Sequence, residues 1–445
     1  KFYEKIKVPP PTWCPECRFK RRLVFWNEHN LYKKKDAHTG KEIFSMFPSG
    51  SDVKVYEHDY WWSDAFDARQ FGRDYDFKRS FFEQFRELLN DVPWYARSIQ
   101  KVVNSDYSNN ATSLKNCYLC FNGNNSEDCM YGIAFYDMKN CLDFYQCEKA
   151  ELSYDIFSVG PGYKNFSCME CGNCRDSWFL LSCNDCSNCF GCVNLRHKQY
   201  HIFNKPYTKA EYFKKLEEFN LESYKSYMEI RKQIHDFWKQ YPRKYMHSVH
   251  NKDASGDYVY SSKNARWCYQ AVGVENSKWT QNVVEVDDSY DYTNWGLRSE
   301  LIYETITCGE DLARLKFCVE CWPACQDLEY CISCHSSTNL FGCVGLKKGQ
   351  YMILNKQYTK GEYAALREKI IKQMEEVPYT DKQRRVYKYG EFFPIEFSPF
   401  AYTEAAVSDY YPLEKKEAIE QGFVWRDPNP KEFKAAIQAA DLPDH

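Results

Sequence analysis

This sequence of 445 residues contains no run of about 18 apolar residues, so we expect no membrane-spanning segment. It also lacks a P-loop, a GxSxG elbow, an HExxH helix and a dinucleotide fingerprint. Paired acids such as Asp287 and Asp288 fall at predicted turns, where solvated carboxylates are the simplest interpretation. These absences predict a protein that is not an enzyme and has no small-molecule substrate. The net charge of −3 restricts any nucleic-acid contact to a local patch.

The chain begins without a signal peptide and without an initiator Met, at Lys1-Phe-Tyr-Glu-Lys. We therefore expect either processing or a longer protein of which this is one part. The 22 cysteines do not suggest a disulfide scaffold, because such scaffolds are short, whereas this chain is long and 18% aromatic. We expect reduced thiols and a cytoplasmic protein.

The middle of the chain is duplicated: residues 116–208 and 264–359 share one pattern. Early positions recur at a shift of 148, so that Asn116, Asp128 and Asn140 correspond to Asn264, Asn276 and Asp288. Later positions recur at a shift of 151, as in Asn188–Leu195 against Asn339–Leu346. The difference, 151 − 148, means that the second copy carries three inserted residues. A duplication of this length predicts a repeat architecture.

Within each copy, Asn or Asp recurs every twelve residues before a short aromatic or apolar run. Asn and Asp suit tight turns because they tolerate left-handed backbone. The pattern predicts a mainly β fold with helices: a tandem duplicated, Cys-rich parallel β-solenoid whose later units vary from roughly 8 to 15 residues.

Helices are expected where capping boxes open them, at Thr208 with Glu211 and at Thr359 with Glu362. The predicted helices span 80–90, 209–219, 222–240, 360–376 and 413–421. The expected domains are 1–50 (zinc knuckle), 51–100 (aromatic linker with a short helix), 101–245 (first copy with helices), 246–377 (second copy with a helix) and 378–445 (extended tail).

The duplication tests which cysteines are metal ligands. Six cysteines of the first copy are replaced in the second: Cys117 by Ala265, Cys129 by Ser277, Cys141 by Ser289, Cys147 by Trp295, Cys186 by Ser337 and Cys189 by Leu340. Zinc ligands do not exchange for Ala, Leu or Trp, so these positions indicate packing. Retained cysteines leave two alternatives, a buried ladder or one zinc site per copy from Cys168, Cys171, Cys174, Cys183 and from Cys318, Cys321, Cys325, Cys334.

Thiol redox catalysis is a remote alternative. A redox CxxC needs a lowered thiol pKa, and the CxxC runs of the solenoid lie in strand-like segments with no recurring Cys–His pair.

The N-terminal Cys14-Pro-Glu-Cys17 motif is typical of a zinc knuckle, which supplies two ligands of a tetrahedral site. His38 is a possible further ligand, with His29 and Asp36 also near, or a second CxxC precedes Lys1. An unmetallated knuckle is the alternative.

A basic cluster follows the knuckle, interleaved with aromatic residues. It comprises Arg18, Lys20, Arg21, Arg22, Lys33, Lys34 and Lys35. Such a surface beside a zinc knuckle is typical of RNA-binding ribbons. The alternative is a basic face that packs on the solenoid.

Several of these segments resemble an uncharacterised, cysteine-rich zinc-ribbon protein family common in candidate-phyla-radiation (Patescibacteria) bacteria. The resemblance rests on the Phe2–Val8 opening with Cys14–Arg18, Trp61–Asp64, Phe81–Phe85, the Asn339–Leu346 and Ile353–Lys360 signatures, and Tyr387–Pro394. It implies further zinc ribbons before and after this chain, and it implies no established activity. The sequence departs from the family at Lys34-Lys35-Asp36, where a Cys is usual.

We therefore expect a zinc-containing adaptor that docks on RNA or a ribonucleoprotein such as the ribosome. The alternative is a protein–protein scaffold or a self-assembling structural protein.

Overall fold

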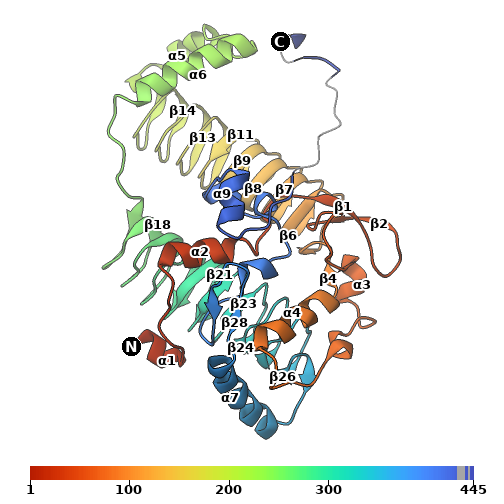
Figure 1. The fold of residues 1–445 in the computed structure, drawn as a ribbon. Helices are drawn as coiled ribbons and strands as arrows, with labels where there is room; N and C mark the ends of the chain where they lie inside the picture. The colour runs from red at the N-terminus through yellow and green to blue at the C-terminus, as the bar shows by residue number, and fades with distance from the viewer. Residues whose placement is uncertain (428–435, 439–440, 445) are drawn as a thin grey trace. The chain divides into compact units, whose positions relative to one another are not determined.

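The computed structural model describes residues 1–427, 436–438 and 441–444. The chain divides into two compact units, one built from Lys1–Ala96 and Tyr245–Pro428, the other from Arg97–Lys244 and Asn429–His445. Each unit contains one of the two sequence copies (Figure 1).

The first copy is a parallel β-solenoid, as predicted. Successive coils pair in parallel at a register of twelve residues, as in Ser108↔Cys120, Cys120↔Gly132 and Gly132↔Phe144. The strands are β5 (Ile99–Gln100), β6 (Ser108–Lys115), β7 (Tyr118–Glu127), β8 (Met130–Tyr136), β9 (Leu142–Glu148), β10 (Ala150–Glu151), β11 (Tyr154–Phe157), β12 (Gly162–Phe166), β13 (Cys174–Trp178), β14 (Ser187–Phe190), β15 (Gln199–Ile202) and β16 (Lys205–Pro206). The last of these, β16, ends the sheet as an antiparallel partner of β15.

Left-handed residues recur at every third position of the coil. Asn116, Leu119, Asn122 and Asn125 have φ angles of 54°, 49°, 53° and 50°. The residue after each points inward where it is buried, as Cys117 and Cys120 do. Four such positions in twelve residues give each coil four short sides of three residues.

The Asn and Asp positions that predicted turns are among these left-handed residues. Asp128 and Asn140 have φ angles of 55° and 51°, and Asn264 has 50°. Their side chains bond along the stack, since Asn116 Nδ2 donates to Asp128 Oδ1 at 2.9 Å. The short polar side chain therefore satisfies both the backbone conformation and its neighbour on the next coil.

The second copy is a solenoid of the same kind with three longer coils. The register runs through Tyr290↔Tyr303, Tyr303↔Lys316 and Lys316↔Glu329, thirteen residues at each step, and returns to twelve at Glu329↔Phe341. These three steps account for the three inserted residues. The expectation of coils of 8 to 15 residues was too broad, because the paired coils have twelve or thirteen residues, apart from eleven at the first pairing of the second solenoid, Ser248↔Val259.

The strands of the second solenoid follow in chain order. They are β17 (Ser248–Val249), β18 (Gly256–Tyr260), β19 (Cys268–Val272), β20 (Gln281–Asp287), β21 (Tyr290–Glu300), β22 (Tyr303–Ile306), β23 (Lys316–Val319), β24 (Gln326–Glu329), β25 (Thr338–Phe341), β26 (Gln350–Ile353) and β27 (Lys356–Gln357).

Each solenoid ends in helices opened by the predicted capping boxes. Thr208 caps α5 (Lys209–Glu217) and Thr359 caps α7 (Lys360–Glu376), each through its Glu three residues later. After the first solenoid, α5 and α6 (Tyr224–Trp238) cover the last coils (Figure 1). Phe219, between the two helices, stacks on Phe190 with the ring centroids 4.4 Å apart. Burying these aromatic side chains closes the apolar end of the stack.

Residues 1–96 and the described part of the tail cover the second solenoid. They form α1 (Phe2–Ile6), α2 (Pro15–Leu23), α3 (His58–Trp62), α4 (Phe81–Asp91), α8 (Val407–Tyr410) and α9 (Lys415–Glu420), with the short strand pairs β1 (Tyr32–Lys35)–β2 (Glu42–Ser45), β3 (Val55–Tyr56)–β4 (Trp94–Tyr95) and β28 (Tyr379–Thr380)–β29 (Val386–Tyr387). Phe2 stacks on Tyr290 at 3.9 Å, and Phe85 stacks on Phe393 at 4.9 Å. The tail predicted over 378–445 packs on this solenoid up to residue 427. The rest of the predicted tail lies largely outside the described residues.

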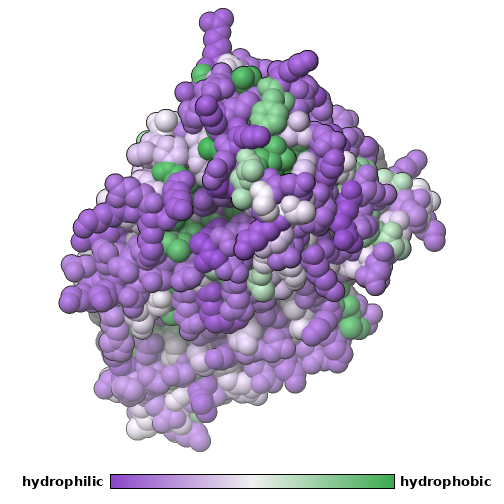
Figure 2. Space-filling view, turned by 90° about the horizontal axis from the view of Figure 1, so that it is seen from below, coloured by the Kyte–Doolittle hydropathy of each residue, from purple (hydrophilic) through white to green (hydrophobic). Residues whose placement is uncertain are grey.

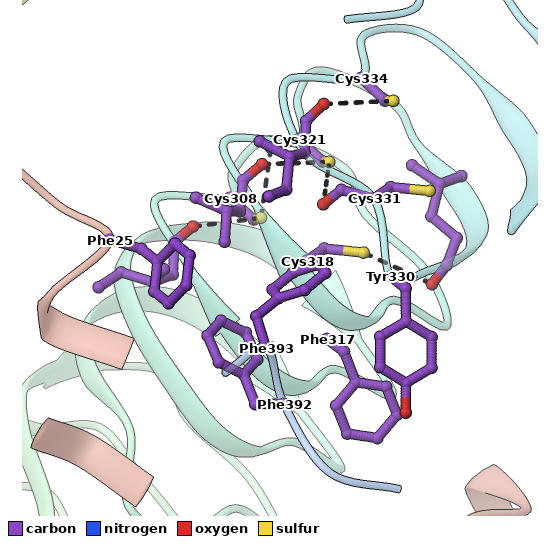
Figure 3. Close-up of a cluster of buried hydrophobic side chains, with 14 of the residues drawn as sticks. Phe25, Cys308, Phe317, Cys318, Cys321, Tyr330, Cys331, Cys334, Phe392 and Phe393 are labelled. Carbon is purple, nitrogen blue, oxygen red and sulfur yellow. Dashed lines mark hydrogen bonds between the residues drawn. The ribbon is translucent and has the colours of Figure 1, made fainter. Parts of the chain in front are cut away.

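The interior of the second solenoid combines cysteine with aromatic residues. Cys308, Cys321 and Cys334 follow one another on successive coils, and Phe317 and Tyr330 stack outside them at 4.6 Å (Figure 3). Phe392 and Phe393 of the tail lie against this cluster (Figure 3). The core is therefore shared between the coils and the segments that cover them.

The surface is mainly polar. Figure 2 shows one face of the molecule, where hydrophilic residues predominate and hydrophobic residues appear in small patches. Among the described residues, every helix is too short or too polar to cross a bilayer.

Candidate functional site

The two knuckle cysteines lie together at the start of α2. Cys14 is the N-cap residue, and its Sγ accepts a hydrogen bond from the backbone N–H of Cys17 at 3.3 Å. This N–H lowers the pKa of the Cys14 thiol, whereas burial raises that of Cys17. Both residues are exposed. The geometry thus presents two adjacent thiols, one favoured as thiolate, which suits half of a tetrahedral zinc site.

The predicted further ligands lie elsewhere. His38 stacks on Tyr60 at 3.8 Å, and Asp36 accepts hydrogen bonds from its own turn at Thr39. Within the part of the chain that the structure describes, one group of three possible ligands converges, Glu28, His29 and Asp409, and it contains neither cysteine. The structure therefore brings no third ligand to Cys14 and Cys17 from the described residues.

The solenoid cysteines are buried and capped by backbone carbonyls. The thiol of Cys171 donates to the carbonyl of Met169 at 3.2 Å, and that of Cys183 donates to Leu181 at 3.4 Å. Serine makes the same bond, since Ser277 Oγ donates to the carbonyl of Glu275 at 2.6 Å. This shared bond explains why Cys and Ser exchange between the copies.

The other cysteines of the two predicted solenoid sites behave alike. Their thiols donate to the carbonyl two residues earlier: Cys168, Cys174, Cys318, Cys321, Cys325 and Cys334. Figure 3 shows this bond for Cys321 and Cys334 of the second copy. All 22 cysteines are free thiols, and among the described residues no three of their sulfur atoms gather within 4.8 Å of one another. This arrangement matches the ladder rather than a closed four-thiolate site.

Three arginines of the predicted RNA surface are buried in ion pairs. Arg18 Nη2 lies 2.7 Å from Asp291 Oδ2, and Arg22 Nη1 lies 3.1 Å from Asp291 Oδ1. Arg21 bonds to Glu304 at 3.0 Å and to Glu391 at 2.8 Å. Burial alone would lower the pKa of Arg18, but the charge of Asp291 outweighs it and the pKa is raised.

This placement contradicts the prediction that Arg18, Arg21 and Arg22 contact nucleic acid, because their guanidinium groups are desolvated and already paired. Lys34 is also buried, and its Nζ donates to the carbonyls of Pro48 and Ser51. The three arginines pack onto the solenoid, which was the alternative interpretation of the cluster, and Lys34 packs within the N-terminal segment.

The remaining three lysines of the cluster reach solvent. Lys33 and Lys35 are exposed on β1, and Lys20 is partly exposed beside Glu16 at 2.7 Å. A separate basic cleft of about 350 Å³ has six cationic and three acidic side chains in its lining: Lys5, Lys7, Arg314, Lys316, Lys360 and Arg367, with Asp327, Glu329 and Glu368. Sequence reasoning missed this cleft, because its residues come from distant segments.

The first solenoid has an apolar face that is not covered. Four apolar residues along it are each more than a third exposed: Tyr131 at 48%, Leu142 at 36%, Tyr145 at 38% and Tyr154 at 37%. With Asp143, Asp155 and Phe157 they form what we call the open face. A cleft of about 410 Å³ lies on it, bordered by Arg231 and His235 of α6.

The equivalent face of the second solenoid is buried. Tyr303, which corresponds to Tyr154, is fully buried, and Tyr290, which corresponds to Leu142, lies under Phe2. Sequence reasoning missed this difference. The signal was present in the alignment of the copies, where apolar residues recur at outward positions of both.

Comparison with known proteins adds no functional assignment. Neither a family model nor a curated protein matches the sequence. A solved structure of a proposed acetyltransferase from Desulfovibrio desulfuricans G20 aligns over 65% of this chain and 75% of its own, at 10% identity and a TM-score of 0.13. A likeness at that score supports no argument about fold or activity.

Proposed function

We propose that this chain is a non-enzymatic binding protein, a rigid tandem solenoid that docks a protein partner on the open face of its first copy. The observation that carries this proposal is the difference between the copies. The face that the second copy buries under residues 1–96 is exposed in the first. Contiguous exposed apolar residues of this kind mark interaction sites in soluble proteins.

The scaffold suits this role because its coils hold the face in a fixed shape. Backbone hydrogen bonds join each coil to the next, and the interior is filled by buried side chains. A preorganised surface lowers the entropy lost when a partner binds. The free thiols are compatible with a reducing compartment, which supports the expected cytoplasmic location.

The test is affinity capture with matched variants. Leu142→Lys/Tyr154→Lys places two charges on the open face, whereas Val249→Lys/Val272→Lys changes exposed apolar residues of the second copy. We expect a partner retained by the wild type and by the control variant, and at least tenfold less of it on the open-face variant. Identical retention by all three proteins would contradict the scaffold.

Light scattering on the same proteins identifies self-assembly. A wild-type oligomer that Leu142→Lys/Tyr154→Lys breaks into monomers would make the partner a second copy of this chain.

RNA docking, including docking on a ribosome, is the second candidate, and the basic cleft favours it. Six cations against three carboxylates give the cleft a positive field in a protein of net charge −3. Lys7→Glu/Lys360→Glu should weaken salt-sensitive RNA binding, and Lys33→Glu/Lys35→Glu tests the lysines of β1. Lys139→Glu/Lys149→Glu, on exposed lysines of the first copy, is the control. RNA binding unchanged in every variant would remove this candidate.

Zinc is proposed at Cys14 and Cys17. The pair supplies two thiolate ligands on a helix start fixed by three buried arginines. Two more ligands must complete a tetrahedral site. Zinc there would have a structural role.

A further inference from the structure

We infer that the open face of the first solenoid recognises an arginine-bearing helix of a partner protein, with Asp143 and Asp155 as its acidic anchors. This inference rests on the proposed scaffold function and names the chemistry of the partner. It is drawn from the occupant that the chain itself places on the equivalent face of the second solenoid.

In the second solenoid that occupant is α2. Its arginines bond to Asp291 and Glu304, which stand at the same position of two successive coils. The guanidinium group of Arg18 also lies over the ring of Trp279, 5.1 Å from its centroid. Acids within an aromatic surface therefore hold the helix, and arginine suits them because its planar group bonds to carboxylates and stacks on rings.

The first solenoid repeats these acids at the equivalent positions. Asp143 corresponds to Asp291 at the shift of 148. Asp155 corresponds to Glu304, because the coil from Asp291 to Glu304 has thirteen residues where the coil from Asp143 to Asp155 has twelve. Tyr131 stands where Trp279 stands, and Tyr154 stands where Tyr303 stands. The acidic and aromatic elements of an arginine site are thus present on both copies. In the second copy α2 pairs with both acids, whereas in the first copy α6 pairs through Arg231 with Asp155 alone.

The acids of the first copy are accessible. Asp143 is exposed and forms no ion pair with the described residues. Asp155 is half-buried, and its Oδ2 lies 3.3 Å from Arg231 and accepts hydrogen bonds from Ser167 at 2.7 Å and from Tyr227 at 3.5 Å. Both acids border the cleft of about 410 Å³. Burial and the charge of Asp155 raise the pKa of Asp143, so an arriving cation would relieve repulsion between the two carboxylates.

The helix must come from another protein. The α2 arginines of a second copy are buried in their own chain, with exposed fractions of 2% or less. They are therefore unavailable to a neighbour unless the second copy's core opens. A lysine-bearing helix would bind less well, since a single ammonium group cannot bridge two carboxylates in a planar fork.

A synthetic peptide with the sequence of residues 11–26, with both cysteines replaced by serine, serves as the probe. Fluorescence anisotropy with the full chain measures its affinity. We expect saturable binding that weakens at least tenfold in Asp143→Asn/Asp155→Asn and stays within twofold in the control Asp128→Asn/Asp137→Asn. A peptide with its three arginines replaced by glutamine should bind at least tenfold more weakly. Circular dichroism checks that each variant is folded.

Two results would overturn the inference. One is the absence of saturable peptide binding, and the other is binding that Asp143→Asn/Asp155→Asn leaves unchanged, which would place the peptide elsewhere. The capture experiment separates this failure from that of the scaffold. If the peptide fails while Leu142→Lys/Tyr154→Lys still loses a partner, the face binds a partner without arginine recognition; if that variant loses nothing, the scaffold itself is refuted.

Discussion

One guanidinium nitrogen of Arg21 donates to both carboxylate oxygens of Glu304, at 3.0 Å each, and both side chains are fully buried. A second nitrogen of Arg21 bonds to Glu391 at 2.8 Å. These three residues come from α2, from a solenoid strand and from the C-terminal tail. The ion pairs therefore join three distant segments at one point, and their loss should lower the stability of the whole unit.

Removing one partner of this network should destabilise the protein strongly. Arg21→Ala leaves Glu304 buried without its bidentate partner, and we expect a loss of about 3–5 kcal/mol in the free energy of unfolding. Chemical denaturation measures it, with Lys35→Ala as the exposed control, which should change stability by less than about 0.5 kcal/mol. A loss in Arg21→Ala no larger than in the control would show that the network does not form.

The left-handed positions predict a difference between two substitutions at Asn116. Its φ angle of 54° suits glycine but strains a β-branched residue. We expect Asn116→Val to cost about 1–3 kcal/mol. Asn116→Gly loses only the side-chain bonds along the stack and should cost about 1 kcal/mol or less. Equal losses in thermal or chemical unfolding would argue against the left-handed conformation.

The carbonyl-capped thiols predict which cysteine substitutions are tolerated. Cys129 donates to the carbonyl of Glu127 at 3.3 Å, and its equivalent Ser277 makes the same bond. Cys129→Ser should therefore change the free energy of unfolding by less than about 1 kcal/mol. Cys129→Leu overfills the same space and should cost about 1–3 kcal/mol. The reverse order in a denaturation series would disprove the ladder explanation.

Glu320 predicts a pH dependence of stability. Burial raises the pKa of this carboxyl from 4.5 to about 8, and Tyr95 donates a hydrogen bond to it. The folded protein thus holds a proton that the unfolded chain releases. The free energy of unfolding should fall as pH rises from about 4.5 to 8, by up to about 1.4 kcal/mol per unit.

Glu320→Gln imitates the protonated form and should flatten this slope. Unfolding at pH 5.5 and at pH 7.5 measures the effect, with Glu368→Gln on the exposed side of α7 as the control. A slope that Glu320→Gln leaves unaltered would mean that Glu320 does not titrate in this range.

Metal analysis distinguishes the two sets of candidate zinc ligands. Protein purified without chelators should lose its zinc in Cys14→Ser/Cys17→Ser and keep it in Cys171→Ser/Cys174→Ser. The occupancy of the wild type at several protein concentrations shows whether the remaining ligands come from the same chain or from another molecule. Zinc that depends on Cys171 and Cys174 would instead place a metal inside the solenoid.

Much of the architecture could be predicted from Asn116, Asp128 and Asn140. Their spacing reports the coil length directly, because a left-handed corner before an inward residue favours Asn or Asp. The later coils were misjudged because other corners carry residues such as Leu119, whose type gives no sign of a turn. Cysteine also occupies several inward positions of one coil, so the spacing of the cysteines did not show the twelve-residue period.

The placement of Arg18, Arg21 and Arg22 could not be predicted from their own segment. A basic, aromatic helix beside a knuckle has the same local sequence whether it faces RNA or a buried acid. The acids that decide the matter, Asp291 and Glu304, stand 273 and 283 residues from Arg18 and Arg21. Only the alignment of the two copies, in which apolar residues recur at outward positions, indicated that this face of the second solenoid contacts another segment.

The constant coil of twelve residues in the first solenoid has a consequence for how such a chain can change during evolution. Deleting or adding twelve residues anywhere between β6 and β13 returns every later residue to its former side of the coil. A gene could therefore lengthen or shorten this part in steps of one coil, each worth about 4.8 Å along the axis. The reach of the protein is adjustable while its cross-section stays the same.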